Sequence, residues 1–286
     1  MKDPIFGLSY APSSYGKTVD TGYAFPNGLF ICKRGGTKSI TSVCGFSPAT
    51  LLHSTLDDAT RALHTHGKKF DAIIIDEFDF LVEDTFRHLE QRFSGFKLFG
   101  ELRKSILTFR NVARDCGTHV WLTALEKGPK VRDDGRKIRG GPSLTGDLPE
   151  KVPAMCDLVV RGARDPLRKP WPGIYRIDVN STDWVGKDRD NGTPDPAPMN
   201  IGEILRLNGY ELSRHPSVPW QEQMVEGIAI EMIGAGPSED VEVAKKWFSQ
   251  LLSKGVTPAS ARWTVRDAWD RTILRRAQAA RHSSFF

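Results

Sequence analysis

The sequence of 286 residues is poor in cysteine and has no long apolar run. Its four cysteines stand alone, form no CxxC pair and argue against a disulfide framework or a structural zinc site; they are Cys32, Cys44, Cys116 and Cys156. No apolar stretch approaches the roughly 20 residues that cross a bilayer. The first residues also lack the apolar core of a signal peptide. We therefore expect a cytoplasmic protein that makes no membrane contact.

Internal repeats and low-complexity blocks are also missing, and a composition of 39% hydrophobic and 26% charged residues is ordinary for a globular protein. The length allows one large domain or little more. The net charge is only +5, while residues 254–286 hold seven basic and two acidic residues. A polyanion would therefore meet this tail or local basic loops, although a solvated helix face is an equal alternative for the tail.

Short apolar runs alternate with helix-like stretches through the first two hundred residues, which predicts an α/β core with a mainly parallel sheet. The apolar run 72–75 is typical of a central strand buried on both faces. Residues 190–198, rich in Pro and Gly, are expected to form a loop. We expect strands at residues 5–9, 28–32, 72–75, 119–124, 158–161 and 174–179, and helices at 17–24, 49–66 and 99–116.

A second break at residues 215–219 predicts the boundary between the core, residues 1–213, and a helical C-terminal segment, residues 214–286. Residues 238–240 and 257–258 carry helix-start signals. Helical spacing predicts that Val265, Ala268, Trp269 and Ile273 pack against Trp247, Phe248 and Leu251. The i,i+4 spacing of Asp267 and Arg271 suggests an ion pair on this helix.

A phosphate-binding pattern follows the first expected strand. The eight residues match GxxxxGK[ST] except at the first position: Ala11, Pro12, Ser13, Ser14, Tyr15, Gly16, Lys17 and Thr18. In such a loop, backbone N–H groups face phosphate oxygens, the lysine reaches the β and γ phosphates, and the hydroxyl binds Mg²⁺. A plain turn before a helix is the alternative, because Ala11 replaces the first Gly.

Two further polar positions are expected at the same edge of the sheet. The apolar strand 72–75 ends in Asp76 and Glu77, where Asp76 would hold Mg²⁺ beside Thr18 and Glu77 would polarise the attacking water. Asp79 and Glu83 are expected on the surface. Thr123, near the end of the next strand, could contact the γ-phosphate or the water, or it could simply be a β-branched strand residue.

In this order of motifs, followed by the segment 140–149 and an apolar strand after Cys156, the chain resembles the compact RecA-like P-loop ATPases of bacteriophages over residues 4–210. Some members of that group are single-strand annealing recombinases and others are nucleotide-binding proteins. The resemblance implies ATP and Mg²⁺ as cofactors, single-stranded DNA as partner, and a location in the host cytoplasm. Lys33 and Arg34 stand where relatives often have an acidic residue, which leaves Glu77 as the candidate catalytic carboxylate.

The resemblance also suggests a role for Lys187 and Arg189. In ring- and filament-forming RecA-like ATPases, such a KxR element reaches the γ-phosphate of the neighbouring subunit, where two cations stabilise the developing charge. This implies a homo-oligomer, either a ring or a filament. The alternative is a charged hairpin tip.

Residues 128–148 and their flank combine glycines with basic side chains, a composition suited to sequence-independent contact with a phosphate backbone. The basic residues are Lys127, Lys130, Arg132, Arg136, Lys137 and Arg139. A solvated hairpin built on Asp134 and Gly135 is the alternative.

Taken together, these features predict a Mg²⁺-dependent ATPase that acts on single-stranded DNA in phage recombination, annealing or replication. Two alternatives remain from the sequence: a nucleotide-gated DNA-binding scaffold without significant hydrolysis, and a helicase-loader or motor subunit.

Overall fold

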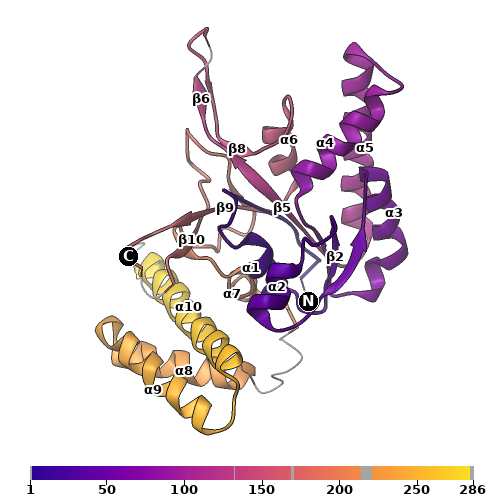
Figure 1. The fold of residues 1–286 in the computed structure, drawn as a ribbon. Helices are drawn as coiled ribbons and strands as arrows, with labels where there is room; N and C mark the ends of the chain where they lie inside the picture. Colours follow the sequence, from indigo (N-terminus) through magenta and orange to yellow (C-terminus); the bar gives the residue numbers. More distant parts are fainter. Residues whose placement is uncertain (1, 132, 169–170, 214–220, 284–286) are drawn as a thin grey trace.

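The computed structural model describes residues 2–131, 133–168, 171–213 and 221–283 (Figure 1). Its strands are β1 (Phe6–Ala11), β2 (Leu29–Cys32), β3 (Ala49–Leu52), β4 (Ala72–Ile75), β5 (His119–Lys127), β6 (Lys130–Val131), β7 (Lys137–Ile138), β8 (Gly141–Pro142), β9 (Leu158–Arg164), β10 (Gly173–Arg176), β11 (Lys187–Asp188) and β12 (Ala197–Pro198). Its helices are α1 (Lys17–Ala24), α2 (Lys38–Cys44), α3 (Leu56–His66), α4 (Phe78–Glu90), α5 (Gly95–Asp115), α6 (Leu148–Met155), α7 (Ile201–Leu207), α8 (Gln221–Ala235), α9 (Asp240–Ser253) and α10 (Pro258–Ser283), with 3₁₀ turns η1 (Gly67–Lys69) and η2 (Pro237–Glu239).

The central sheet has the order β12-β10-β9-β1-β5-β4-β2-β3. The strands from β9 to β3 run parallel, and β10, β12, β11 and β8 add antiparallel pairings. β5 lies between β1 and β4, so the loop after β1 and the residues after β4 are separated by one strand. The predicted α/β class with a mainly parallel sheet is confirmed.

Alternate residues of β4 face opposite sides of the sheet, as the pleat of a strand requires. Ile73 and Ile75 join a core cluster with α3, α4 and α5, whereas Ala72 and Ile74 join a second cluster with α1, α2 and α7. Figure 1 shows these two groups of helices on the two faces of the sheet. All four residues of β4 are fully buried, as their composition predicts.

The predicted helix at 49–66 is wrong in its first part. Residues 49–52 form β3, an exposed edge strand paired in parallel with β2. The helix α3 begins only at Leu56, because Thr55 and Asp58 form a capping box in which Thr55 Oγ1 accepts from the Asp58 N–H and Asp58 accepts from the Thr55 N–H. The Ala and Leu residues of β3 have helix propensity, which the pairing with β2 overrides.

The three C-terminal helices α8, α9 and α10 enclose an apolar cluster of their own. It contains the predicted packing of Val265, Ala268, Trp269 and Ile273 on Trp247, Phe248 and Leu251. The expected break at residues 215–219 lies outside the described residues. The predicted pair between Asp267 and Arg271 is wrong: Asp267 accepts from Tyr23 and Asn200, and Arg271 binds Glu203, Glu222 and Glu226.

The basic residues of α10 mostly bind partners within the chain. Arg266 donates to Met199 O and lies 3.7 Å from Asp20 and 3.5 Å from Asp270, whereas Arg275 and Arg276 pair with Glu226 and Asp240. Stacking of Trp263 on Tyr23 adds an aromatic contact, with ring centroids 4.1 Å apart. These ion pairs attach α10 to α8 and α9 within the C-terminal segment, and through Arg266 and Arg271 to α1 and α7 of the core.

Asp20 is the centre of this attachment on the α1 side. It is buried, accepts from Tyr175 Oη at 2.8 Å and from the Ile201 N–H at 3.2 Å, and burial raises its pKa to about 7 although Arg266 opposes the rise. Because α1 begins at Lys17, α10 contacts the helix that follows the phosphate-binding loop.

None of the helices in the described parts of the chain combines the length and the apolar character that crossing a bilayer requires.

We predict that Arg266→Met lowers the free energy of unfolding by about 3–5 kcal/mol, because it removes the cation beside the buried Asp20 and one of the two cations, Arg266 and Arg168, that contact the buried Asp270. Urea denaturation followed by tryptophan fluorescence measures this loss. Arg262→Met, at an exposed position one turn earlier, is the matched control and should change stability by less than about 0.5 kcal/mol. Equal denaturation midpoints for the two variants would contradict the ion-pair account.

Candidate active site

The loop between β1 and α1 has the backbone shape of a phosphate-binding loop. Ser14 and Gly16 adopt left-handed conformations, with φ of 64° and 91°. Gly16 is the N-cap of α1 and has no side chain to cap it, so the N–H groups of the first turn remain available to an anion. The sequence therefore folds here into a cradle at the amino end of a helix.

The replacement of the first Gly of the pattern by Ala11 has a local explanation. Ala11 is the last residue of β1, is fully buried and keeps a negative φ, so it needs no glycine for its backbone conformation. Its methyl group faces Gly162 of β9, where an added Cβ would lie only 2.8 Å from the Ala11 Cβ. Because Gly162 has no side chain, the methyl group of Ala11 fits between β1 and β9.

Lys17 begins α1, and its ammonium group turns back onto the loop. Nζ donates to Ala11 O at 2.9 Å and to Pro12 O at 3.0 Å. Burial lowers the pKa of Lys17, and the carboxylates of Asp79, Asp76, Glu77 and Glu126 oppose that shift. The ammonium group therefore stands among nearby acidic groups at the point where the phosphates of a nucleotide would be bound.

Asp76 connects the loop to the neighbouring strands. Thr18 Oγ1 lies 3.0 Å from Asp76 Oδ1, and Thr123 Oγ1 donates to the same oxygen at 2.7 Å. The carboxylate is only 2% exposed, and burial raises its pKa to about 6 against the opposing effect of the two hydroxyl donors. The register places Thr123 opposite Ser9 of β1, so β5 brings this hydroxyl between the two motifs.

Glu77 follows as the N-cap of α4 in a strained conformation, with φ of 62° and ψ of 53°. Its N–H donates to Thr123 Oγ1 at 3.0 Å, so one hydroxyl binds Asp76 and also holds the turn at Glu77. Thr123 is 1% exposed and lines the cleft. Within the chain the partners of its hydroxyl are thus Asp76 and Glu77, and its expected contact with the γ-phosphate or the water stays a prediction.

These residues surround a cleft of about 310 Å³ lined by Ser13, Ser14, Gly16, Lys17, Thr18, Val19, Ser39, Glu77, Thr123, Ala124 and Leu125. The predicted loop residues and the Asp76–Glu77 pair therefore meet at the carboxyl edge of the sheet. A hydroxyl and a carboxylate are oxygen donors of the kind that Mg²⁺ prefers, and the cradle with Lys17 suits a polyphosphate. The residues present fit a magnesium nucleotide.

Three groups near this cleft are not apparent from the sequence pattern. Asp79 is buried, contrary to the surface position expected; its Oδ1 accepts from the Leu125 N–H at 3.3 Å, and burial raises its pKa. Glu126 lies at the end of β5, 3.9 Å from Arg161. Arg164, the last residue of β9, lies over the ring of Tyr15 at 4.8 Å. Only the pairing of the strands reveals that these residues approach the loop.

Lys187 and Arg189 lie at the opposite edge of the sheet. β11 pairs with the amino end of β9, with Lys187 opposite Val159. Lys187 Nζ donates to Ala154 O at 2.6 Å, and Arg189 Nη1 lies 2.8 Å from Asp157 Oδ1. The alternative of a charged hairpin tip is therefore wrong, because both side chains contact the body of the protein. Both cations also lie at the opposite edge of the sheet from Lys17 of their own chain. Their expected action on a neighbouring subunit stays a prediction.

The basic segment after β5 forms the hairpin β6–β7, which projects from the body of the protein (Figure 1). Gly135 supplies a left-handed residue in its turn. Lys137 pairs with Asp183, and Arg139 lies 3.8 Å from Glu150. Arg132 lies outside the described residues. The hairpin alternative is thus observed, and contact with DNA stays a prediction.

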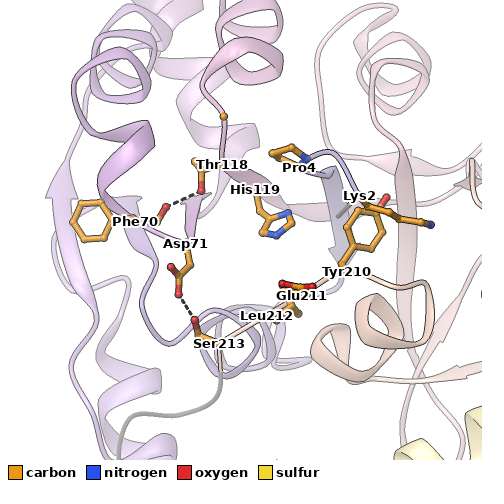
Figure 2. A pocket seen from close by; sticks show the side chains of 11 residues that line it. Lys2, Pro4, Phe70, Asp71, Thr118, His119, Tyr210, Glu211, Leu212 and Ser213 are labelled. Atoms are coloured by element: carbon orange, nitrogen blue, oxygen red, sulfur yellow. Dashed lines mark hydrogen bonds between the residues drawn. The ribbon is translucent and has the colours of Figure 1, made fainter.

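Another cleft, of about 670 Å³, lies at the amino edge of the sheet (Figure 2). Its polar side chains already have partners in the chain: Thr118 donates to Phe70 O, Ser213 donates to Asp71, and the Ile5 N–H donates to His119 Nδ1. Being at the other edge, it is separate from the phosphate-binding loop.

A family model described as the AAA domain matches residues 4–189. A search of curated proteins finds no match to the sequence. Among solved structures, a KaiC-like protein from the archaeon Pyrococcus horikoshii OT3 is 12% identical, with a TM-score of 0.41 over 62% of this chain and 79% of that one. The RadB recombinase is 14% identical, with a TM-score of 0.39 over 62% and 81% of the two chains.

We predict that Asp76→Asn stabilises the nucleotide-free protein at pH 8 and abolishes Mg²⁺-dependent nucleotide binding. The pKa of Asp76 is raised from 3.8 to about 6 on folding, so wild-type stability falls as pH rises between these values while the Asn variant has no charge to bury. Melting temperatures measured from pH 4 to pH 8 should therefore diverge by several degrees in favour of the variant, with most of the divergence below about pH 6. Equal melting temperatures at pH 8 would contradict the burial of a charged carboxylate.

Proposed function

The chain belongs to the AAA domain family, and on that premise we propose that it binds and hydrolyses ATP with Mg²⁺ at the cleft formed by β1, β4 and β5. The observation that carries this proposal is the Asp76 carboxylate, held by the hydroxyls of Thr18 and Thr123 beside the loop that contains Lys17. Three separate segments of the chain contribute to this one group. The alternative, a plain turn before a helix, does not account for these contacts between distant segments.

Each residue has a distinct part in the proposed reaction. Lys17 leaves the loop carbonyls to bind the β and γ phosphates, and the N–H groups at the start of α1 bind further phosphate oxygens. Thr18 and Asp76 supply oxygen ligands for Mg²⁺, which neutralises charge on the phosphates when bound. Glu77 orients and polarises the attacking water. Thr123 is a positioning residue, because its hydroxyl sets both Asp76 and the turn at Glu77.

The left-handed backbone of Glu77 supports its assigned role. A non-glycine residue in this region costs about 1–3 kcal/mol and persists where the surroundings fix it. Here the Thr123 hydroxyl and the start of α4 fix it, and Glu77 lines the same cleft as Lys17. The conformation is consistent with a side chain that must be held at one place for catalysis.

We further propose that the protein acts on single-stranded DNA through the hairpin β6–β7, in recombination, annealing or replication. After the ion pairs of Lys137 and Arg139 are taken into account, Lys130 of β6 and Lys127 at the end of β5 are the cations that this proposal assigns to DNA. Contacts of this kind read the phosphate backbone without reading sequence. DNA affinity should then fall steeply with salt concentration.

We also propose a homo-oligomer, ring or filament, in which Lys187 and Arg189 act on the neighbour's nucleotide. This role requires both cations to leave Ala154 O and Asp157. A subunit with Lys187→Gln and Arg189→Gln should regain activity when mixed with a Lys17→Ala partner. If the mixture hydrolyses ATP no faster than the separate variants, the proposed action of Lys187 and Arg189 on a neighbouring subunit is contradicted.

One alternative function is a nucleotide-gated scaffold that binds DNA without significant hydrolysis. A helicase-loader or motor subunit is a second, separate alternative. The basic residues Lys33 and Arg34 at the end of β2 favour the scaffold, since relatives often place a carboxylate there. Release of phosphate from ATP by the wild-type protein, with and without single-stranded DNA, separates the enzyme from the scaffold.

We predict that Glu77→Gln keeps ATP binding and lowers phosphate release by about two to three orders of magnitude, because it removes a charge that acts on the water in the transition state. Lys17→Ala should lose binding itself. Glu83→Gln, an exposed carboxylate on the same helix, is the matched control and should keep wild-type turnover. Wild-type turnover by Glu77→Gln would remove Glu77 from the mechanism.

A further inference from the structure

The ends of β2 and β3 form a second pocket at the carboxyl edge of the sheet. It has a volume of about 710 Å³, and its lining includes Lys33 and Arg34 after β2, His53 after β3, and Asp84, Arg87 and His88 of α4. In the sheet order, β4 and β5 separate these strands from β1. The pocket is therefore distinct from the cleft at the phosphate-binding loop and shares no lining residue with it.

The most informative group in this pocket is His53. His53 is only 8% exposed, yet neither its Nδ1 nor its Nε2 has a hydrogen-bond partner among the described residues. A buried polar group without a partner costs about 1–3 kcal/mol, so native proteins rarely keep one without a reason. Because His53 lines the pocket, a ligand in the pocket could supply the missing partner.

The charges around His53 favour an anion over a cation. Three cationic side chains, Lys33, Arg34 and Arg87, line the pocket with a single carboxylate, Asp84, which binds Lys33 Nζ at 2.8 Å. Arg87 pairs with Glu83 of its own helix at 2.5 Å, so Arg34 is the lining cation without an ion pair among the described residues. Burial lowers the pKa of His53, and the neighbouring Lys33 lowers it further. Among the described residues, no group of three or more His, Cys, Asp or Glu side chains could hold a metal ion.

The lining also indicates which anion would fit. Donors approach from three elements: the ammonium and guanidinium groups after β2, the imidazole and the Ser54 hydroxyl after β3, and the Arg87 guanidinium of α4. A tetrahedral phosphoryl group offers oxygens in several directions and pairs well with guanidinium groups, whereas a planar carboxylate offers two oxygens in one plane. The lining contains no Phe, Tyr or Trp side chain on which a base could stack.

We propose that this pocket is a second phosphoryl-binding site, in which His53 donates an imidazole N–H to a phosphate oxygen and Lys33 and Arg34 neutralise its charge. The phosphoryl group comes either from the backbone of a nucleic acid or from a free phosphorylated small molecule. Lys33 contacts Asp84 on α4, and the N-cap of the same helix, Glu77, lines the nucleotide cleft, so the two sites are joined by one helix.

The test follows the histidine side-chain resonances of the ¹⁵N-labelled full-length chain while inorganic phosphate or oligo(dT) is added. Lys17→Ala is used as the background, so that the phosphate-binding loop does not take up the probe and the result does not depend on ATP hydrolysis. We expect the His53 nitrogens to shift with saturation. His64 and His66 at the far end of α3 and His119 at the start of β5 serve as internal references.

A paired substitution supplies the control. Lys33→Gln with Arg34→Gln should weaken the affinity by about tenfold or more, whereas Lys68→Gln with Lys69→Gln removes the same charge from η1 and should leave it unchanged. Shifts caused by phosphate alone assign a small phosphorylated ligand, and shifts by oligo(dT) at lower concentration assign a nucleic acid backbone. The proposal is overturned if His53 moves with neither probe, or if the two double variants bind equally.

Discussion

The candidate site depends on one hydroxyl group, that of Thr123. It donates to Asp76 Oδ1 at 2.7 Å and accepts from the Glu77 N–H at 3.0 Å. Asp76 in turn accepts from Thr18, which follows Lys17 in the phosphate-binding loop. A buried carboxylate is unfavourable unless hydrogen bonds satisfy it, and here the donors come from the first turn of α1 and from β5. The same contacts that make the burial tolerable also align the loop, the carboxylate and the strained Glu77.

The order of the strands makes this arrangement possible. β5 lies between β1 and β4, and its register sets Thr123 level with the ends of both. On the other face, α10 fixes α1 through Arg266, Asp20 and the stacked rings of Trp263 and Tyr23. The loop is therefore held from the strand side by β5 and from the helix side by the C-terminal segment. Residues more than 240 positions apart contribute to its placement, as the Tyr23–Asp267 hydrogen bond, with a separation of 244, illustrates.

Local sequence patterns predicted correctly the elements whose conformation depends on residues close together in the chain. The fully apolar β4, the loop with Gly16 and the start of α10 at Pro258 all appear where the sequence predicts them. Features that depend on pairing between distant segments were missed: the edge strand β3, the burial of Asp79 and the placement of Lys187 at the amino edge. The replacement of the first loop glycine by Ala11 is understood only when β9 is paired with β1, because Gly162 of β9 then faces the Ala11 methyl group. Likewise, the basic tail looks free for a polyanion until the acidic partners of α10 are placed beside it.

The central claim is that the Thr123 hydroxyl organises a magnesium-nucleotide site. Thr123→Val removes this hydroxyl with little change of shape, and Thr118→Val is the matched control because its hydroxyl binds Phe70 O at the opposite end of β5. The most direct measurement is the rate of phosphate release from Mg²⁺-ATP by the two variants at equal protein concentration. The account predicts at least about a tenfold loss for Thr123→Val, corresponding to about 1.4 kcal/mol, and little loss for Thr118→Val. Equal rates for Thr123→Val and the wild type would contradict it.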